Sequence, residues 1–149
     1  MTDRELMNEA LRLAKEAYSD GEVPVGAVIA LNGEIVSTGR NRREKLKNAL
    51  SHAEIEAINS ACEKLGRWRL DDCVLYVTLE PCPMCAGAIV LARLDAVVWG
   101  VGDPKRGGGT AFGIFDHPGI NHHPAVVAGI CEMESKAMLR GFFQERRIR

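Results

Sequence analysis

The chain has 149 residues, 46% of them hydrophobic and 26% charged, and its formal net charge is −1. This composition is typical of a soluble globular protein, and the length predicts a single domain over residues 1–149. Five cysteines without a secretory signal pattern exclude a disulfide framework, and the longest strongly apolar run, Ala86 to Ala92, is too short to cross a bilayer. We therefore expect a cytoplasmic protein with no membrane partner.

Hydrophobic periodicity and turn signals predict four helices and five strands. In chain order these are a helix between Thr2 and Gly21, strands at 25–31 and 35–38, a helix at 51–65, a strand at 73–79, a helix at 83–93, strands at 96–101 and 125–128, and a helix at 133–147. Thr2 and Glu5 have the spacing of a capping box, and Asn32-Gly33 is the strongest short hairpin signal. Ser51 is predicted to cap the second helix, after a polar, basic loop at 40–50.

This order of elements predicts an α/β domain with a mixed sheet covered by helices. The helix at 83–93 is apolar nearly all round, so it must bury more than one face. We expect one face to pack on the sheet and another to meet a second subunit. The glycine-rich stretch at 102–124 is predicted to be irregular, and irregular segments of that length usually have a function.

Two short motifs at predicted helix starts carry the chemistry, His52-Ala53-Glu54 and Pro81-Cys82-Pro83-Met84-Cys85. Cys82 and Cys85 are three residues apart, so they share one face of a first helical turn, where the helix dipole favours thiolates. With His52 they supply three zinc ligands and leave one tetrahedral position open for water. Glu54 is two residues from a ligand, where it can move protons without binding the metal. The pattern predicts a zinc-dependent hydrolytic deaminase.

Each motif has a simpler interpretation when it is taken alone. Ser51 and Glu54 also have capping-box spacing, a lone Cys-x-x-Cys pair can be redox-active, and a lone histidine is more often structural than a ligand. A purely structural zinc would need a fourth protein ligand, and no second ligand pair is recognisable in the sequence. We expect surface or packing roles for His117, His122 and His123. The occurrence of both motifs together favours the catalytic site.

The chain resembles the cytidine-deaminase-like superfamily, and within it the bacterial tRNA-specific adenosine deaminases, from about Leu6 to Arg147. The resemblance is carried by Gly21–Ala27 (GEVPVGA), Asn41-Arg42, His52-Ala53-Glu54, Leu75–Cys85 (LYVTLEPCPMC), Ala86-Gly87-Ala88, Asn121-His122 and Phe142-Phe143. It implies a three-layer α/β/α fold with a five-stranded mixed sheet, a homodimer and one Zn²⁺ per subunit. The chain departs from the family's usual pattern at 48–51, 105–110 and 123–125, where substrate contacts are expected.

The resemblance also implies a substrate and the residues that seat it. The substrate is adenosine at the wobble position of a tRNA anticodon loop, which is converted to inosine with release of ammonia. Asn41 is implied to hydrogen-bond the nucleoside, and Asp103 to lie near the bound nucleotide. The backbone of Ala53 and a floor around Val25 and Leu79 are implied to help seat the base.

Two other functions remain open: a deaminase of a free nucleobase or nucleoside, of the guanine or cytosine type, and a zinc domain that binds RNA without catalysis. The intact Glu54 argues against the second. An open cleft with arginines at its rim would favour RNA, and a closed pocket would favour a free base. The basic residues available for phosphate contact are Arg40, Arg42, Arg43, Lys45, Lys47, Arg140, Arg146, Arg147 and Arg149.

Overall fold

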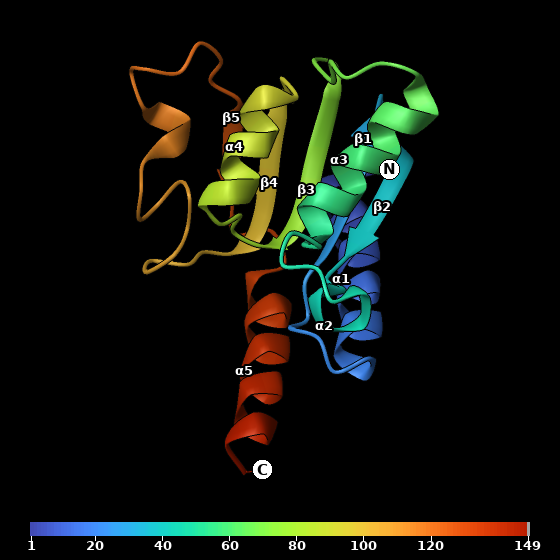
Figure 1. Cartoon of the computed structure of the whole chain (residues 1–149), viewed down its shortest axis with the longest axis vertical. Coiled ribbons are helices and arrows are strands. Elements are labelled where there is room, and N and C mark those ends of the chain that lie inside the picture. The colour runs from blue at the N-terminus through green and yellow to red at the C-terminus, as the bar shows by residue number, and fades with distance from the viewer. Residues whose placement is uncertain (149) are drawn as a thin grey trace.

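A mixed sheet with helices on both faces organises the computed structural model, which describes the backbone of residues 1–148 and the side chains of residues 1–146 (Figure 1). The helices are α1 (Asp3–Ser19), α2 (Arg43–Leu46), α3 (Ala53–Leu65), α4 (Pro83–Leu91), the 3-10 helix η1 (Ile114–Asp116) and α5 (Glu132–Ile148), and the strands are β1 (Gly26–Leu31), β2 (Glu34–Arg40), β3 (Cys73–Leu79), β4 (Ala96–Val101) and β5 (Ala125–Ala128). The five strands have the order β2-β1-β3-β4-β5; β1 is antiparallel to β2 and β3, and β4 is parallel to β3 and β5. The expected three-layer fold with a five-stranded mixed sheet is confirmed.

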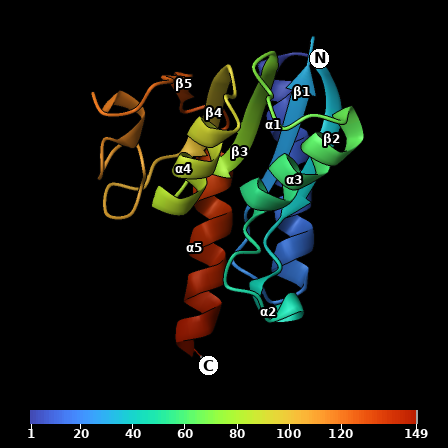
Figure 2. The ribbon, with the colours of Figure 1, turned by 45° about the horizontal axis from the view of Figure 1, so that its top comes forward.

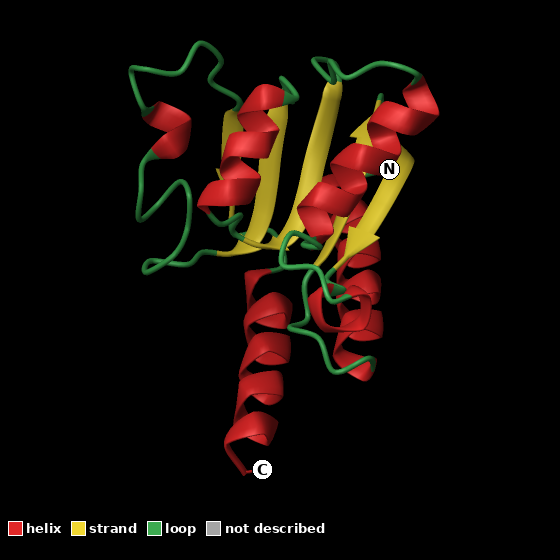
Figure 3. Ribbon diagram, viewed as in Figure 1, coloured by secondary structure: helices red, strands yellow, loops and turns green. Residues whose placement is uncertain are grey.

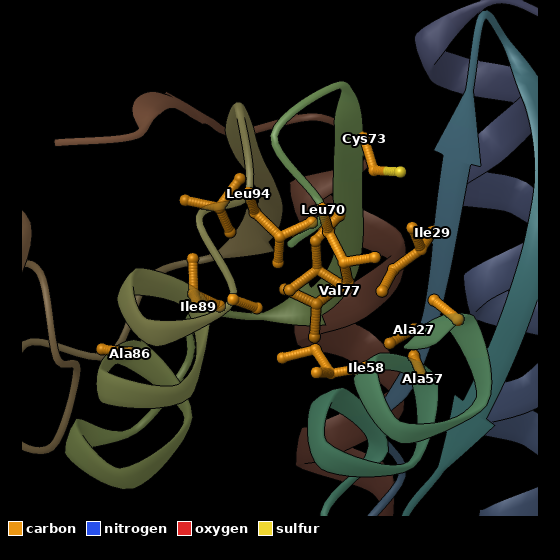
Figure 4. Packing of buried hydrophobic residues seen from close by; sticks show 14 of the residues in the cluster. Ala27, Ile29, Ala57, Ile58, Leu70, Cys73, Val77, Ala86, Ile89 and Leu94 are labelled. Carbon is orange, nitrogen blue, oxygen red and sulfur yellow. The ribbon is translucent and has the colours of Figure 1, made fainter. Parts of the chain in front are cut away.

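Two hydrophobic clusters, one on each face of the sheet, hold the layers together. Alternate residues of β1 serve opposite faces, so Ala27 and Ile29 pack with α3 and α4 whereas Val28 packs with α1. Figure 4 shows Ile58 of α3 and Ile89 of α4 pointing toward the strands. In Figures 1 and 2, α3 and α4 lie on one face, α1 lies on the other, and α5 projects beyond the ends of the strands.

Local sequence signals account for the first elements. The Thr2 hydroxyl accepts a hydrogen bond from Glu5 N–H at 3.1 Å, and the Glu5 carboxylate accepts one from Thr2 N–H at 3.1 Å. The predicted capping box of α1 is therefore confirmed. Asn32 and Gly33 both have positive φ, 52° and 76°, as the tight turn between β1 and β2 requires.

Glycine at two positions lets helices approach the β1–β2 hairpin closely. A Cβ on Gly26 would lie 2.0 Å from the carbonyl oxygen of Ala10 in α1. A Cβ on Gly39 would lie 2.2 Å from the carbonyl oxygen of Ala53, the first residue of α3. The second contact matters for the site, because it sets the position of the helix start that carries His52 and Glu54.

Two sequence predictions around the basic loop are wrong. Ser51 does not cap α3, since the N-cap residue is His52, whose side chain makes no capping hydrogen bond. Ser51 instead joins the loop, with its carbonyl accepting from Arg42 N–H at 3.0 Å and its N–H donating to Asn48 O at 3.2 Å. The loop predicted at 40–50 contains the short helix α2. Because His52 is the N-cap, Glu54 is the second residue of the helix and not the third, so the alternative in which Glu54 merely completes a capping box does not hold.

The long segment between β4 and β5 is irregular, as expected, apart from η1 (Figure 3). It leaves the sheet after Val101, the last residue of β4, and returns at Ala125. Among the described helices, none is both long and apolar enough to cross a membrane.

Candidate active site

The fold brings His52, Cys82 and Cys85 together as a candidate metal site. His52 is the N-cap of α3, Cys82 is the N-cap of α4, and Cys85 lies in the first turn of α4. His52 Nδ1 lies 3.7 Å from Cys82 Sγ and 3.6 Å from Cys85 Sγ. Tetrahedral zinc with Zn–S of about 2.3 Å and Zn–N of about 2.05 Å requires S-to-N distances of about 3.6 Å. The three side chains therefore fit a zinc ion without rearrangement.

The electrostatics of the two cysteines are those of a metal-binding pair. Hydrogen bonding from Cys85 lowers the pKa of Cys82 to about 4, and His52 adds to this effect. The hydrogen bond to Cys82 and burial raise the pKa of Cys85. The hydrogen bond to Cys82 also raises the pKa of His52. One thiolate is thus already favoured, and a bound cation would favour the second.

Glu54 lies beside this site and is not one of its ligands. Only three residues form the ligand cluster within the described part of the chain, and Glu54 is not among them. Its side chain lines the same pocket as His52 and Cys82, yet the residue is only 4% exposed. Burial raises the pKa of Glu54 to about 7. A carboxyl group of that pKa is suited to take up and release protons near neutral pH.

A cavity of about 820 Å³ opens over the site. It is lined by Val23, Val25, Asn41, Arg43, His52, Glu54, Leu79, Glu80, Cys82, Val101, Gly102, Asp103, Arg106, Lys136, Leu139, Arg140, Phe143 and Gln144. Four of the five residues expected to seat the substrate, Val25, Asn41, Leu79 and Asp103, are in this set. Ala53 is completely buried and is not in it.

Asn41 links the pocket wall to the start of α3. Its Nδ2 donates to Val23 O at 3.0 Å, and its Oδ1 accepts from Ala53 N–H at 2.9 Å. The Ala53 N–H is therefore already engaged. A side-chain amide carries two hydrogens on its nitrogen, so Asn41 keeps one of them for a ligand in the pocket.

Four cationic side chains line the cavity from three separate segments. Arg43 comes from α2, Arg106 from the loop after β4, and Lys136 and Arg140 from α5. Within the described residues, none of the four forms an ion pair with an acidic side chain. Cations that are not neutralised by the protein are available for phosphate groups.

The other described basic residues proposed for phosphate contact do not line this cavity; among them, Lys45 pairs with Asp20 at 3.9 Å and Lys47 is exposed. Arg40 pairs with Glu16, and Arg42 pairs with Glu56 at 2.8 Å, and neither arginine lines the cavity. Arg146 lies over the ring of Phe142 at 4.7 Å. Arg147 and Arg149, which are also predicted to contact phosphate, have side chains outside the described part of the chain.

Sequence reasoning missed two buried glutamates that shape the pocket. Glu22 is 3% exposed and accepts from the N–H groups of Glu44 and Lys45 at 3.1 and 2.8 Å, which holds α2 and its Arg43 in place. Glu80 is 2% exposed and accepts four hydrogen bonds from the loop after β4. Both residues lie in stretches that carry the family resemblance, but no local pattern indicates their role, because their hydrogen-bond partners lie more than 20 residues away.

The late histidines are bonded within their own loop or to the turn between α4 and β4. His122 Nε2 lies 2.7 Å from Leu94 O, and His123 Nδ1 lies 2.8 Å from Phe115 O. His117 Nδ1 accepts from Gly119 N–H at 2.8 Å. These contacts agree with the expected packing roles.

Comparisons with known proteins agree with this geometry. A profile of the MafB19-like deaminases matches residues 1–147. The tRNA-specific adenosine deaminase of Bacillus subtilis (strain 168) is 50% identical over 149 residues, covering 99% of this chain and 92% of the relative. A solved structure from a study of A-to-I editing by tRNA:A34 deaminases is 43% identical, with a TM-score of 0.88 over 91% of this chain and 99% of that one. Guanine deaminase from Bacillus subtilis is 33% identical, with a TM-score of 0.66 over 100% of this chain and 96% of that one.

Proposed function

We infer that this chain, which belongs to the MafB19-like deaminase family and is related over its length to bacterial tRNA-specific adenosine deaminases, converts adenosine to inosine at the wobble position of a tRNA. The reaction is a hydrolysis that releases ammonia. The observation that carries the proposal is the placement of Glu54 and the three-ligand cluster in an open cavity with four unneutralised cations along its lining. A base splayed from an RNA loop needs such a cavity, and its flanking phosphates need the cations.

The chain's own residues divide the chemical work. His52, Cys82 and Cys85 would hold a zinc ion, which would lower the pKa of a bound water molecule so that it can attack near neutral pH. Glu54 would pass one proton of this water to the ring nitrogen as the oxygen bonds to the carbon that carries the amine. It would then pass the second proton, from the new hydroxyl, to the amine, whose bond to that carbon breaks with release of ammonia. Burial raises the pKa of Glu54 and keeps bulk water from competing for the proton.

Five residues are proposed to seat the nucleoside. The free amide hydrogen of Asn41 donates to the substrate, and the Ala53 backbone supports it through the bond to Asn41. Val25 and Leu79 form the apolar floor under the base, and Asp103, which lines the same cavity, lies near the nucleotide.

We also propose that the protein acts in the cytoplasm as a homodimer with one zinc per subunit. Leu91 at the end of α4 is 75% exposed, and Val126 and Val127 of the edge strand β5 are both exposed. Exposed apolar side chains on a helix and on a sheet edge favour burial against another subunit. Light scattering on a sizing column tests this, and a monomer at micromolar concentration would contradict it.

A substrate panel tests the activity. Purified protein is incubated with an anticodon stem-loop that carries wobble adenosine and, in parallel, with free adenosine, adenine, guanine and cytosine. We expect inosine in the stem-loop alone. Product from guanine or another free base, with the stem-loop unchanged, would replace the tRNA function with that of a free-base deaminase.

A further inference from the structure

Glu80 is a buried carboxylate that the proposed chemistry does not use. It lies between β3 and the zinc-binding turn, and both of its oxygens are fully engaged. Oε1 accepts from Asp103 N–H and from the Thr110 hydroxyl, each at 2.8 Å. Oε2 accepts from the N–H groups of Gly109 at 3.1 Å and Thr110 at 2.6 Å. Since a carboxylate offers about four acceptor positions, none remains for a substrate.

The loop that supplies these donors is shaped to fit against Glu80 and the metal-binding turn. A Cβ on Gly107 would lie 2.3 Å from the Glu80 carboxyl carbon, and a Cβ on Gly108 would lie 2.5 Å from Ala86 Cβ. The Gly108 N–H donates to Pro81 O at 2.7 Å. The glycines at 107 and 108 are therefore required for contact, because any side chain there would push the loop away.

The same loop carries part of the pocket wall. Gly102, Asp103 and Arg106 line the cavity. The Asp103 carboxylate accepts from the N–H groups of Lys105 and Arg106 at 3.1 and 3.0 Å, so the turn is rigid between these residues. Glu80 ties this turn to Thr110 at the far end of the loop, since it bonds to Asp103 at one end and to Thr110 at the other. Two backbone bonds run alongside it, from Gly107 N–H to Asp103 O at 2.8 Å and from Ala111 N–H to Gly107 O at 2.9 Å.

We propose that Glu80 is a positioning residue that clamps residues 102–110 so that Asp103 and Arg106 face the substrate. It acts through the loop and does not touch the reacting atoms. The proposal rests on the proposed function for the identity of the substrate. The position of the loop can be measured without a substrate, so an experiment can refute the clamp without refuting the proposed function, or the reverse.

The kinetic test uses Glu80→Gln and a matched pair at Thr110. Glutamine keeps the shape of the side chain but replaces one oxygen with an NH2 group, which would face the hydrogen-bond donors of the loop instead of accepting from them. Thr110→Val removes the hydroxyl bond, whereas Thr110→Ser keeps it. We expect Glu80→Gln to raise KM for the stem-loop more than it lowers kcat, with a loss in kcat/KM of about 10- to 100-fold. Thr110→Val follows in the same direction, Thr110→Ser behaves as the wild type, and zinc content is unchanged in all three.

Trp99 supplies the second readout. It is 5% exposed, and a Cβ on Gly109 would lie 3.2 Å from its ring, so the loop covers it. Trp68, the other tryptophan, is 62% exposed, and Trp68→Phe leaves Trp99 as the sole reporter. In this background we expect acrylamide to quench Trp99 more strongly in Glu80→Gln and Thr110→Val than in Thr110→Ser.

The outcomes separate the alternatives. Unchanged quenching and unchanged KM in Glu80→Gln overturn the clamp, and so does a loss of zinc with the loop still closed over Trp99. If Glu80→Gln does not fold, the Thr110 pair decides by the same criteria. Increased quenching in a protein whose wild type does not deaminate the stem-loop would support the clamp and refute the proposed substrate.

Discussion

The cationic lining of the cavity predicts how binding of the stem-loop depends on salt. Arg43, Arg106, Lys136 and Arg140 are the four cations that line the cavity without an acidic partner in the described chain. Each phosphate contact to a single strand contributes a slope of about −0.7 in log K against log salt, so four contacts give about −2.8. Between 50 and 200 mM salt, affinity should then fall about 50-fold.

Removal of one cation gives a measurable change in that slope. Arg140→Gln should lower its magnitude to about 2.1, so that the same rise in salt weakens binding only about 20-fold. Lys64→Gln is the matched control, because Lys64 is an exposed cation near the C-terminal end of α3, away from the site. Fluorescence anisotropy of a labelled stem-loop, measured in a Glu54→Gln background to prevent turnover, gives both slopes. A slope near zero, or one that Arg140→Gln leaves unchanged, would refute the assignment of these cations to RNA phosphates.

Three further predictions concern Glu54 and the start of α3. Glu54→Gln should retain zinc and lower kcat about 100- to 10,000-fold; metal analysis and single-turnover assays check this, and near-normal turnover would exclude the proton-shuttle role. In the zinc-free protein, burial raises the folded-state pKa of Glu54 from 4.5 to about 7. Its contribution to the free energy of unfolding is therefore fully present below pH 4.5 and falls by about 3 kcal/mol as the pH rises through 7. Glu54→Gln should remove this loss. Urea unfolding at pH 5 and pH 8 measures it, and an equal change in the free energy of unfolding for the wild type and the variant would show that the reasoning is wrong. Gly39→Ala should cost about 1–3 kcal/mol and reduce zinc content by displacing α3, whereas Gly141→Ala, whose Cβ would come no nearer than 3.5 Å to Tyr18, should leave zinc content unchanged in the same melting and metal assays.

The sequence predicted those features of the fold that depend on residues close together in the chain. The capping box of Thr2 and Glu5 and the hairpin turn at Asn32-Gly33 involve residues within a few positions of each other, and both form as expected. The zinc motif was also recognisable, because each half lies within a single helix start. Ser51 failed as a cap because its backbone groups bond to the loop at Arg42, a contact that no local pattern encodes.

The pocket walls depend on distant contacts and were not predictable. Glu80 finds its partners 23 to 30 residues later in the chain, in a glycine-rich segment without secondary structure of its own. Arg42 is one residue from Arg43, yet it pairs with Glu56 of α3 whereas Arg43 lines the cavity. Only the folded arrangement separates an arginine that holds the structure from one that is free for substrate.

The most direct test of the account is to map inosine at single-nucleotide resolution in a stem-loop that carries adenosine at the wobble position and elsewhere in the anticodon loop. The wild-type protein should produce inosine at the wobble position alone, and the zinc-loaded Glu54→Gln variant should form it at least about 100-fold more slowly. Inosine formed by that variant at the wild-type rate, or none formed by the wild type, would contradict the assignment of this site as a deaminase of the wobble adenosine.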